Sequence, residues 1–154
     1  MVWLGRCKMK KSVGLTLIEV LVVIAMMAIL STIFSLNIFR ILPSIRLSGA
    51  ARNLVLDLKK AQRYAIEQQF IYEVRFLTSE NKYQIIKETN SPVIISEISL
   101  PEEISFGQIS FDPPVVDFNA AGLPSVSGTI ILNNQAGHSA TIEIEPAGFI
   151  KVNQ

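Results

Sequence analysis

The sequence predicts an α+β protein in which one long N-terminal helix packs on an antiparallel β-sheet domain. Two observations predict this class. Residues 15–69 contain no cluster of turn residues, and they pass from a continuous apolar run into an amphipathic helical pattern. The residues after 69 form short runs typical of strands, separated by Gly, Pro, Asn and Ser. With 154 residues, the chain has room for one ordinary domain besides the apolar run.

The first part of the predicted helix is an apolar run of membrane-spanning length. Leu15 to Phe39 comprises 25 residues with a single charge, Glu19. At about 1.5 Å per residue, such a run can cross a bilayer as a helix. The run is preceded by four basic residues, Arg6, Lys8, Lys10 and Lys11. Basic residues on that side place the N-terminus in the cytoplasm, so we expect a transmembrane helix over 15–42 with the rest of the chain outside.

The second part of the helix carries one apolar stripe. Its members recur at spacings of three and four residues: Leu47, Ala51, Leu54, Leu58, Ala61 and Ala65. This spacing predicts that one helix face lies on other elements of the domain. Five basic residues fall off the stripe, which indicates a solvated face: Arg46, Arg52, Lys59, Lys60 and Arg63. Pro43 is expected to kink the helix, because it lacks an amide proton and crowds the preceding turn.

Seven strands are predicted after the helix. They cover residues 70–77, 82–87, 92–100, 104–111, 128–133, 140–145 and 148–152. The connections between them are too short for crossover helices, so the strands are expected to pair mostly antiparallel. One sheet or two small sheets would then cover the amphipathic half of the helix.

The sequence offers no set of residues typical of an active site. His138 is the only histidine, and it lies in "NQAGHSAT", which reads as an exposed turn entering a strand. The single cysteine, Cys7, precedes the apolar run, so no disulfide can form within the chain. We therefore predict no enzyme activity, no catalytic residue and no cofactor.

Two acidic pairs invite a comparison with calcium sites. They are Asp112 with Asp117, and Glu143 with Glu145. Neither pair has the dense alternating oxygen ligands of a calcium-binding loop. The second pair alternates with isoleucines, the pattern of a strand with one solvated face. No metal site is predicted.

Glu19 is a charged residue within the apolar run, and its presence there needs a separate explanation. A carboxylate within a membrane span costs roughly 2.5 to 3.5 kcal/mol on insertion scales. Glu19 could lie near enough to the interface to reach water, or it could be protonated. A third interpretation is that the chain is cut after Gly14, which gives Leu15 a new α-amino group. Glu19 would then pair with the amino terminus of a neighbouring subunit and fix the stagger of packed helices.

These residues carry a resemblance to a known family. "KKSVG" followed by "LTLIEV" resembles the class III signal of type IV pilins and type II secretion pseudopilins. In that signal, a basic leader ends in a glycine, and a glutamate follows four residues after the first residue of an apolar helix. Gly14, Leu15 and Glu19 occupy these positions.

The resemblance implies a domain organisation. Residues 1–14 would be a leader that prepilin peptidase removes between Gly14 and Leu15, with N-methylation of the new terminus. Residues 15–42 would be the transmembrane and filament-assembly helix. Residues 43–154 would be a periplasmic, type IV pilin-like α+β domain. The protein would be a single-pass inner-membrane protein whose N-terminus is cytoplasmic before cleavage.

Two further segments narrow the resemblance to the GspH/FimT group of minor pseudopilins and minor pilins. The first is "LVLDLKKAQRYAIEQQ" followed by a strand. The second is "FNAAGLPSVSGTIILNN" with the final "GFIKV", where Phe118, Gly122 and Gly148 match the group's Phe-x-x-x-Gly segment and Gly-led last strand.

The resemblance implies a structural role in protein export. The chain would be a minor pseudopilin of the type II secretion pseudopilus, with prepilin peptidase, other pilin-like subunits and the inner-membrane assembly platform as partners. The alternative is a FimT-like minor type IV pilin, for pilus assembly or for DNA binding in natural transformation. From Ser44 onward the chain has nine basic and twelve acidic residues, which disfavours nucleic acid as a partner.

Overall fold

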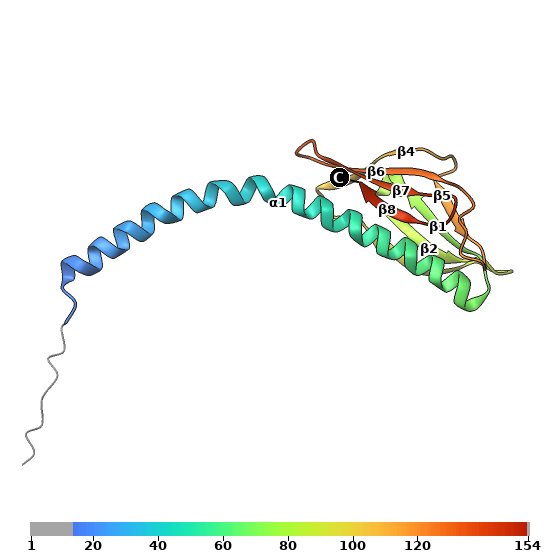
Figure 1. The fold of residues 1–154 in the computed structure, drawn as a ribbon, viewed down its shortest axis with the longest axis horizontal. Coiled ribbons are helices and arrows are strands. Elements are labelled where there is room, and N and C mark those ends of the chain that lie inside the picture. The colour runs from blue at the N-terminus through green and yellow to red at the C-terminus, as the bar shows by residue number, and fades with distance from the viewer. Residues whose placement is uncertain (1–13, 154) are drawn as a thin grey trace, which may run out of the picture. The chain divides into compact units, whose positions relative to one another are not determined.

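A computed structural model describes the backbone of residues 14–153 and the side chains of residues 14–31 and 42–153. The chain divides into two compact units, Met1–Phe39 and Arg40–Gln154. The described residues form one α-helix and eight strands: α1 (Leu17–Gln68), β1 (Tyr72–Leu77), β2 (Lys82–Lys87), β3 (Val93–Ser99), β4 (Ile104–Ile109), β5 (Val115–Phe118), β6 (Gly128–Asn134), β7 (Ser139–Ile144) and β8 (Ile150–Asn153) (Figure 1). A short 3-10 turn, Thr78–Glu80, links β1 to β2.

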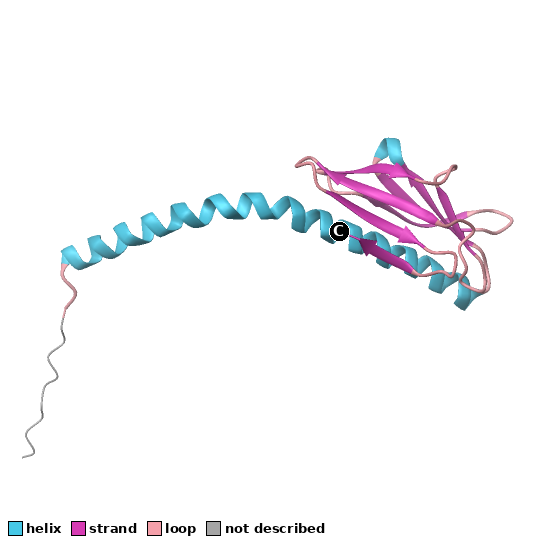
Figure 2. Ribbon diagram, turned by 45° about the horizontal axis from the view of Figure 1, so that its top comes forward, coloured by secondary structure: helices cyan, strands magenta, loops and turns pink. Residues whose placement is uncertain are grey.

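The strands form two antiparallel sheets of four (Figure 2). We call them sheet A, in the order β3-β2-β1-β5, and sheet B, in the order β4-β6-β7-β8. All pairs of neighbouring strands run antiparallel. The predicted α+β class, with a long helix packed on antiparallel sheets, is confirmed.

One strand was missing from the sequence prediction. Strand β5 has only four residues and directly follows Pro113 and Pro114, a combination that reads as a turn. It forms because β1 supplies its partner, with Glu73 opposite Asp117 in the register. The predicted first strand also began too early, since β1 starts at Tyr72 and not at Phe70.

The amphipathic half of α1 supplies one wall of the core. All six residues of the predicted stripe are buried, together with Ala50 and Val55. They share one hydrophobic cluster with residues of both sheets, among them Phe76, Ile85 and Ile142. The three stripe alanines are fully or almost fully buried, and their small side chains let the helix lie close to the strands. Pro43 lies inside the helix, and the kink expected there stays a prediction.

A single glutamine joins the helix to the two glycines of the C-terminal segments. Gln62 Nε2 donates to the carbonyl oxygen of Gly122 at 2.7 Å and to that of Gly148 at 3.0 Å. Both glycines have positive φ, 79° and 83°, which side-chain-bearing residues rarely adopt. A Cβ on Gly122 would also lie 2.7 Å from Ile66 Cδ1. Glycine is therefore required at both positions, where the chain lies close to the helix.

We expect Gln62→Ala to destabilise the domain by about 1–3 kcal/mol, because two carbonyls lose their donor at a partly buried site. The measurement is urea unfolding of the fragment that starts at Ser44. Gln135→Ala is the matched control, since Gln135 is an exposed turn residue, and it should change the free energy of unfolding by less than about 0.5 kcal/mol. Equal effects of the two substitutions would contradict the role given to Gln62.

Candidate processing and assembly site

The predicted cleavage position lies directly before the helix. Gly14, Leu15 and Thr16 have no regular secondary structure, and α1 begins at Leu17. Leu15 is 75% exposed, and apart from Gly14 and its two chain neighbours no described atom lies within 4 Å of the place where a Cβ on Gly14 would stand. A non-helical, exposed bond at this place is open to a peptidase. Residues 1–13 of the predicted leader, including Cys7, lie outside the described residues.

The start of the helix is defined by Thr16 and Glu19. The backbone N–H of Glu19 is 3.3 Å from Thr16 Oγ1 and 3.1 Å from the Thr16 carbonyl oxygen. Thr16 thus satisfies a backbone donor that the first helical turn leaves free. Glu19 lies in that first turn, where the helix dipole favours a negative charge by about 0.3–1 kcal/mol.

Thr16 was not singled out by the sequence analysis. The signal that identifies it is the spacing Thr-x-x-Glu directly before an apolar run, which is typical of a helix N-terminus. This spacing gives Glu19 a local role in addition to the predicted role in assembly. The structure describes Glu19 as an exposed residue.

The helical residues after Glu19 present apolar side chains all round. Every residue from 14 to 31 is exposed. The large apolar side chains exposed there are Leu15, Leu17, Ile18, Val20, Leu21, Val22, Val23, Ile24, Met26, Met27, Ile29 and Leu30. A helix that is apolar on every side needs a covering of other helices or of lipid. Among the residues that were described, no helix is both long and apolar enough to cross a membrane.

The outer face of α1 in the second unit is basic. Four exposed residues form what we call the basic stripe: Arg52, Lys59, Lys60 and Arg63. The solvated face predicted for them is confirmed. None of the four forms an ion pair with a described carboxylate, although Lys60 Nζ lies 5.8 Å from the centroid of the Tyr64 ring. Arg46, the fifth residue of the prediction, forms an ion pair with Glu103.

Three carboxylates meet on sheet A, and we call them the acidic cluster: Glu73, Glu88 and Asp117. Glu73 is 9% exposed, and its Oε1 lies 2.6 Å from Arg75 Nε. Partial burial and the neighbouring Glu73 carboxylate raise the pKa of Glu88. The same two causes raise the pKa of Asp117, against the opposing effects of the Ser125 hydrogen bond and of Arg75. One guanidinium therefore faces three carboxyl groups.

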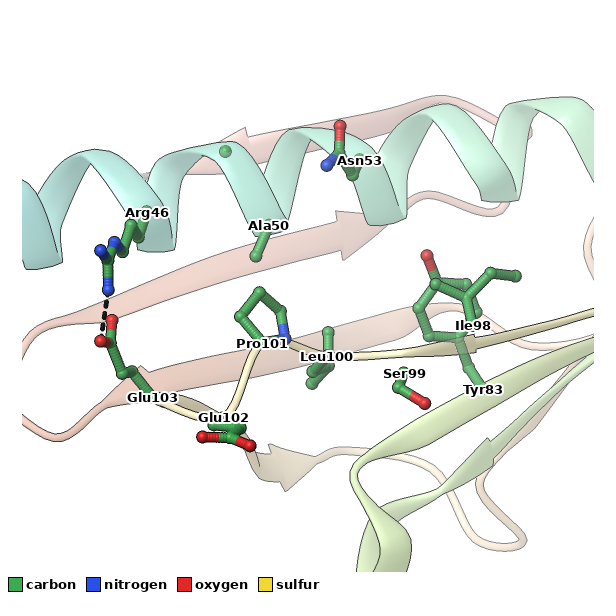
Figure 3. A pocket seen from close by; sticks show the side chains of 11 residues that line it. Arg46, Ala50, Asn53, Tyr83, Ile98, Ser99, Leu100, Pro101, Glu102 and Glu103 are labelled. Atoms are coloured by element: carbon green, nitrogen blue, oxygen red, sulfur yellow. Dashed lines mark hydrogen bonds and ion pairs between the residues drawn. The ribbon is translucent and has the colours of Figure 1, made fainter.

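A groove of about 600 Å³ lies between α1 and the end of β3 (Figure 3). Ala50 and Asn53 line its helix side, Leu100 and Pro101 line its strand side, and the Arg46–Glu103 pair is at one end. Tyr83 also lines it, and its hydroxyl donates to Asp57 Oδ2 at 2.5 Å. Most of the surface of the groove is apolar, although Arg46, Asn53, Ser99, Glu102 and Glu103 also line it.

The remaining sequence candidates take structural places. His138 is exposed in the turn between β6 and β7, where its backbone N–H donates to Asn134 Oδ1 at 2.8 Å. Glu143 and Glu145 are half-buried and alternate with the buried Ile142 and Ile144. The turn and strand interpretations are confirmed. Within the described residues, no group of three or more His, Cys, Asp or Glu is placed to hold a metal ion.

Comparisons with known proteins agree with this arrangement. Residues 9–35 match the model of the prokaryotic N-terminal methylation motif. No curated protein sequence matches the chain significantly. The solved structure of the minor pseudopilin EpsH from the Type 2 Secretion System of Vibrio cholerae is similar, with a TM-score of 0.61 and 11% identity over 70% of this chain and 96% of that chain.

The type IV minor pilin FimU of Pseudomonas aeruginosa is similar too. Its TM-score is 0.58 and its identity 17%, over 70% of this chain and 88% of that chain. One is a minor pseudopilin and the other a minor pilin. The methylation motif and the shared fold confirm the resemblance to type IV pilin-like minor pseudopilins and minor pilins, and at these identities the structural likeness concerns the fold.

We expect Glu88→Gln to raise the Tm of the domain at pH 7, because it removes one charge from the acidic cluster. Because the pKa of Glu88 is raised in the folded domain, the free energy of unfolding falls as the pH rises through that pKa. The gain should therefore shrink as the pH falls, and disappear below the ordinary pKa of 4.5. Glu102→Gln removes a charge from an exposed residue and should show no such pH dependence. Thermal scans from pH 4 to pH 8 compare the two.

Proposed function

We propose that this chain is a minor pseudopilin, a structural subunit of the type II secretion pseudopilus that supports protein export across the outer membrane. The observation that carries the proposal is the exposed apolar surface of residues 14–31, which lies on a helix with a capped start, in a chain with a minor pseudopilin fold. An exposed apolar surface of this size marks a place where lipid or another protein chain covers the helix.

The proposed sequence of events begins at the exposed bond before the helix. Prepilin peptidase cleaves between Gly14 and Leu15, and the new terminus is N-methylated. Residues 15–42 anchor the subunit in the inner membrane, and residues 43–154 fold in the periplasm. The α-amino group on Leu15 is a cation at the membrane surface. It pairs with Glu19 of a neighbouring subunit, and this pairing offsets the cost of holding the carboxylate among apolar helices.

The role in the filament is structural and needs no chemistry from the chain itself. The inner-membrane assembly platform and other pilin-like subunits are the proposed partners. Such a subunit helps to initiate or to cap the filament through its contacts. The groove between α1 and β3 is one surface of the domain that such contacts could use.

A minor type IV pilin is the second candidate, and the likeness to FimU favours it. In that role the same processing and helix packing would serve a pilus, and the basic stripe would be the place to contact DNA. The two roles differ in phenotype. Loss of the chain should abolish export of folded proteins in the first case, and piliation or DNA uptake in the second.

For processing, we expect Gly14→Leu to block removal of the leader while the protein stays in the membrane, because a bulky side chain then occupies the open space beside the scissile bond. Immunoblots of membranes should show only the longer form. A conservative change six residues further along, Val20→Ile, should leave cleavage intact. A shortened product from the Gly14→Leu chain would contradict the assigned cleavage site.

For Glu19, we expect Glu19→Leu to insert into the membrane at least as well as the natural chain, since the substitution removes the one charge from the apolar run. Its defect should appear in assembly. Co-purification with other pilin-like subunits should fall about tenfold or more, the effect of losing about 1.4 kcal/mol of pairing energy. Glu19→Gln should show the same defect, because it keeps the shape and loses the charge. Unchanged export, piliation and co-purification would mean that the carboxylate serves only to start the helix.

A further inference from the structure

We propose that the open edge of β3 pairs with an extended segment of a different pilin-like subunit. The segment adds a strand to the four of sheet A, and its side chains fill the groove between β3 and α1. The inference rests on the proposed role as a filament subunit, and it names the surface through which the domain binds a neighbour.

Strand β3 is the longest open edge of the domain. It pairs with β2 alone, and among the described residues the backbone of Val93–Ser99 makes no hydrogen bond to any other backbone group. The other edges are shorter or partly occupied. On β4 the N–H of Phe106 donates to Asn81 Oδ1 at 3.3 Å, on β5 the carbonyl oxygen of Asp117 accepts from Ser125 at 2.8 Å, and β8 has four residues.

The register shows which backbone groups of β3 point outward. Leu100, directly after the strand, donates its N–H to the carbonyl oxygen of Asn81, the residue opposite it, at 2.8 Å. In an antiparallel pair, residues that bond the partner strand alternate with residues whose N–H and C=O groups point away from it. Counting back from Leu100, the outward residues are Ser99 and Glu97. They offer two donors and two acceptors to an incoming strand.

The first half of β3 exposes apolar side chains. Val93 is 51% exposed, Ile94 55% and Ile95 41%. The register with β2 shifts once in this half and is regular from Ser96 to Ser99, so the outward groups lie in the regular half. An apolar edge strand without charges or prolines in its exposed part is a template for pairing with another chain.

The groove lies beside the same edge (Figure 3). Ile98 stands opposite Tyr83 in the register, and both line the groove. Every second side chain of a strand added beside β3 points to this face. On the helix side, Gly49 and Ala50 leave room. Apart from Gly49, its chain neighbours and the nearby helix backbone, no described atom lies within 4 Å of the place of a Cβ on Gly49.

The charged side chains around the edge are already paired, which favours an uncharged protein segment as the occupant. Lys82 Nζ lies 3.5 Å from Glu97 Oε1, and Gln84 Nε2 donates to Glu97 Oε2 at 2.5 Å. Arg46, which lines the groove, pairs with Glu103. A nucleic acid therefore finds no unpaired cation along the described groove, and lipid tails cannot bond the outward backbone groups.

A different subunit fits this edge better than a second copy. A minor subunit has mostly other chains as its neighbours. Two β3 edges paired antiparallel are related by a twofold axis perpendicular to the sheet, so the α1 helices packed on them would run in opposite directions, unlike subunits anchored in one membrane. Arg46 follows the proposed assembly helix, which ends at residue 42, by four residues. A subunit held by that helix is therefore within reach of the groove.

The test places a photo-crosslinking amino acid at Ile95 of the full chain, in cells that produce the whole assembly system. The control position is Leu123, which follows β5 at the opposite edge of sheet A and has a similar exposure, 45%. We expect adducts with a different pilin-like subunit from position 95, at least about fivefold above those from position 123. Adducts mainly with a second copy, an exported protein, DNA or lipid would overturn the proposal, as would equal yields or no adduct.

A backbone substitution tests the strand pairing itself. Ser99→Pro removes one outward N–H, and a proline at an edge position with its nitrogen facing solvent leaves the pairing with β2 intact. We expect the yield from position 95 to fall about fivefold, the effect of one lost hydrogen bond. Ser99→Ala keeps the N–H and should keep the yield. Equal yields from the two chains would contradict the pairing.

A groove substitution gives an answer that does not depend on how well the proline is tolerated. Gly49→Leu fills the groove from the helix side, whereas Gly49→Ala adds one carbon atom. Both replace a helical glycine with a better helix former, so neither should unfold the domain. We expect Gly49→Leu to lower the yield from position 95 about tenfold and Gly49→Ala to leave it unchanged. A natural yield from the Gly49→Leu chain would show that the groove is not filled by the partner.

This contact and the filament role fail in different ways. If Glu19→Leu abolishes assembly but position 95 gives no adduct with another subunit, the filament role stands and the contact at β3 is wrong. If assembly does not depend on Glu19, the filament role itself is contradicted, whatever the probe at position 95 reports.

Discussion

The apolar helix surface of residues 14–31 is the constraint on which the rest of the account depends. Its side chains make no core within their own unit, and all of these residues are exposed. Burial of apolar surface is worth roughly 25 cal/mol per Å², so a dozen large exposed side chains are a strong drive toward any covering partner. Lipid can supply that covering, and so can other helices of the same kind. Glu19 favours other helices over lipid as the covering. A carboxylate is stabilised by a cation on a neighbouring helix, whereas lipid offers it no stabilising partner.

In the second unit, the apolar residues of the helix are covered by other parts of the same chain. There the helix presents apolar residues on one face only, and two four-stranded sheets cover them. Gln62 then fixes the helix to the carbonyls of Gly122 and Gly148. These contacts give the Phe-x-x-x-Gly segment and the Gly-led last strand a physical meaning. Phe118 is fully buried in the core, and the glycines allow the chain to turn where a side chain would strike the helix.

The basic residues of the domain also differ between the sheets and the outer face of the helix. Basic side chains near the sheets are paired with carboxylates, whereas those of the basic stripe are not. The carboxylates of the acidic cluster outnumber their nearby cation. The carboxylates of the acidic cluster repel one another at a partly buried site, which costs stability in the isolated subunit.

The sequence predicted the features that depend on local periodicity. The extent of α1, the buried stripe from Leu47 to Ala65, and most strands follow from spacing and from turn residues, so they were confirmed with small shifts at the ends. Strand β5 was not predictable in this way, because four residues after two prolines become a strand only through pairing with β1. The Gln62 contacts and the acidic cluster join residues far apart in the chain, which no local pattern indicates. Thr16 was within reach, since its spacing to Glu19 is a known helix-start signal.

The central claim is that another protein chain covers the apolar helix surface and that Glu19 fixes this packing. The most direct measurement is disulfide scanning of the full chain in cells. Single cysteines replace Val20, Leu21, Val22 and Val23 in turn in a Cys7→Ser background, and other pilin-like subunits carry cysteines at matching helix positions. We expect disulfide-linked adducts with another pilin-like subunit at positions on one helix face, and their loss in the Glu19→Leu chain. Chains that remain monomeric at all four positions, or adducts that form equally without Glu19, would contradict it.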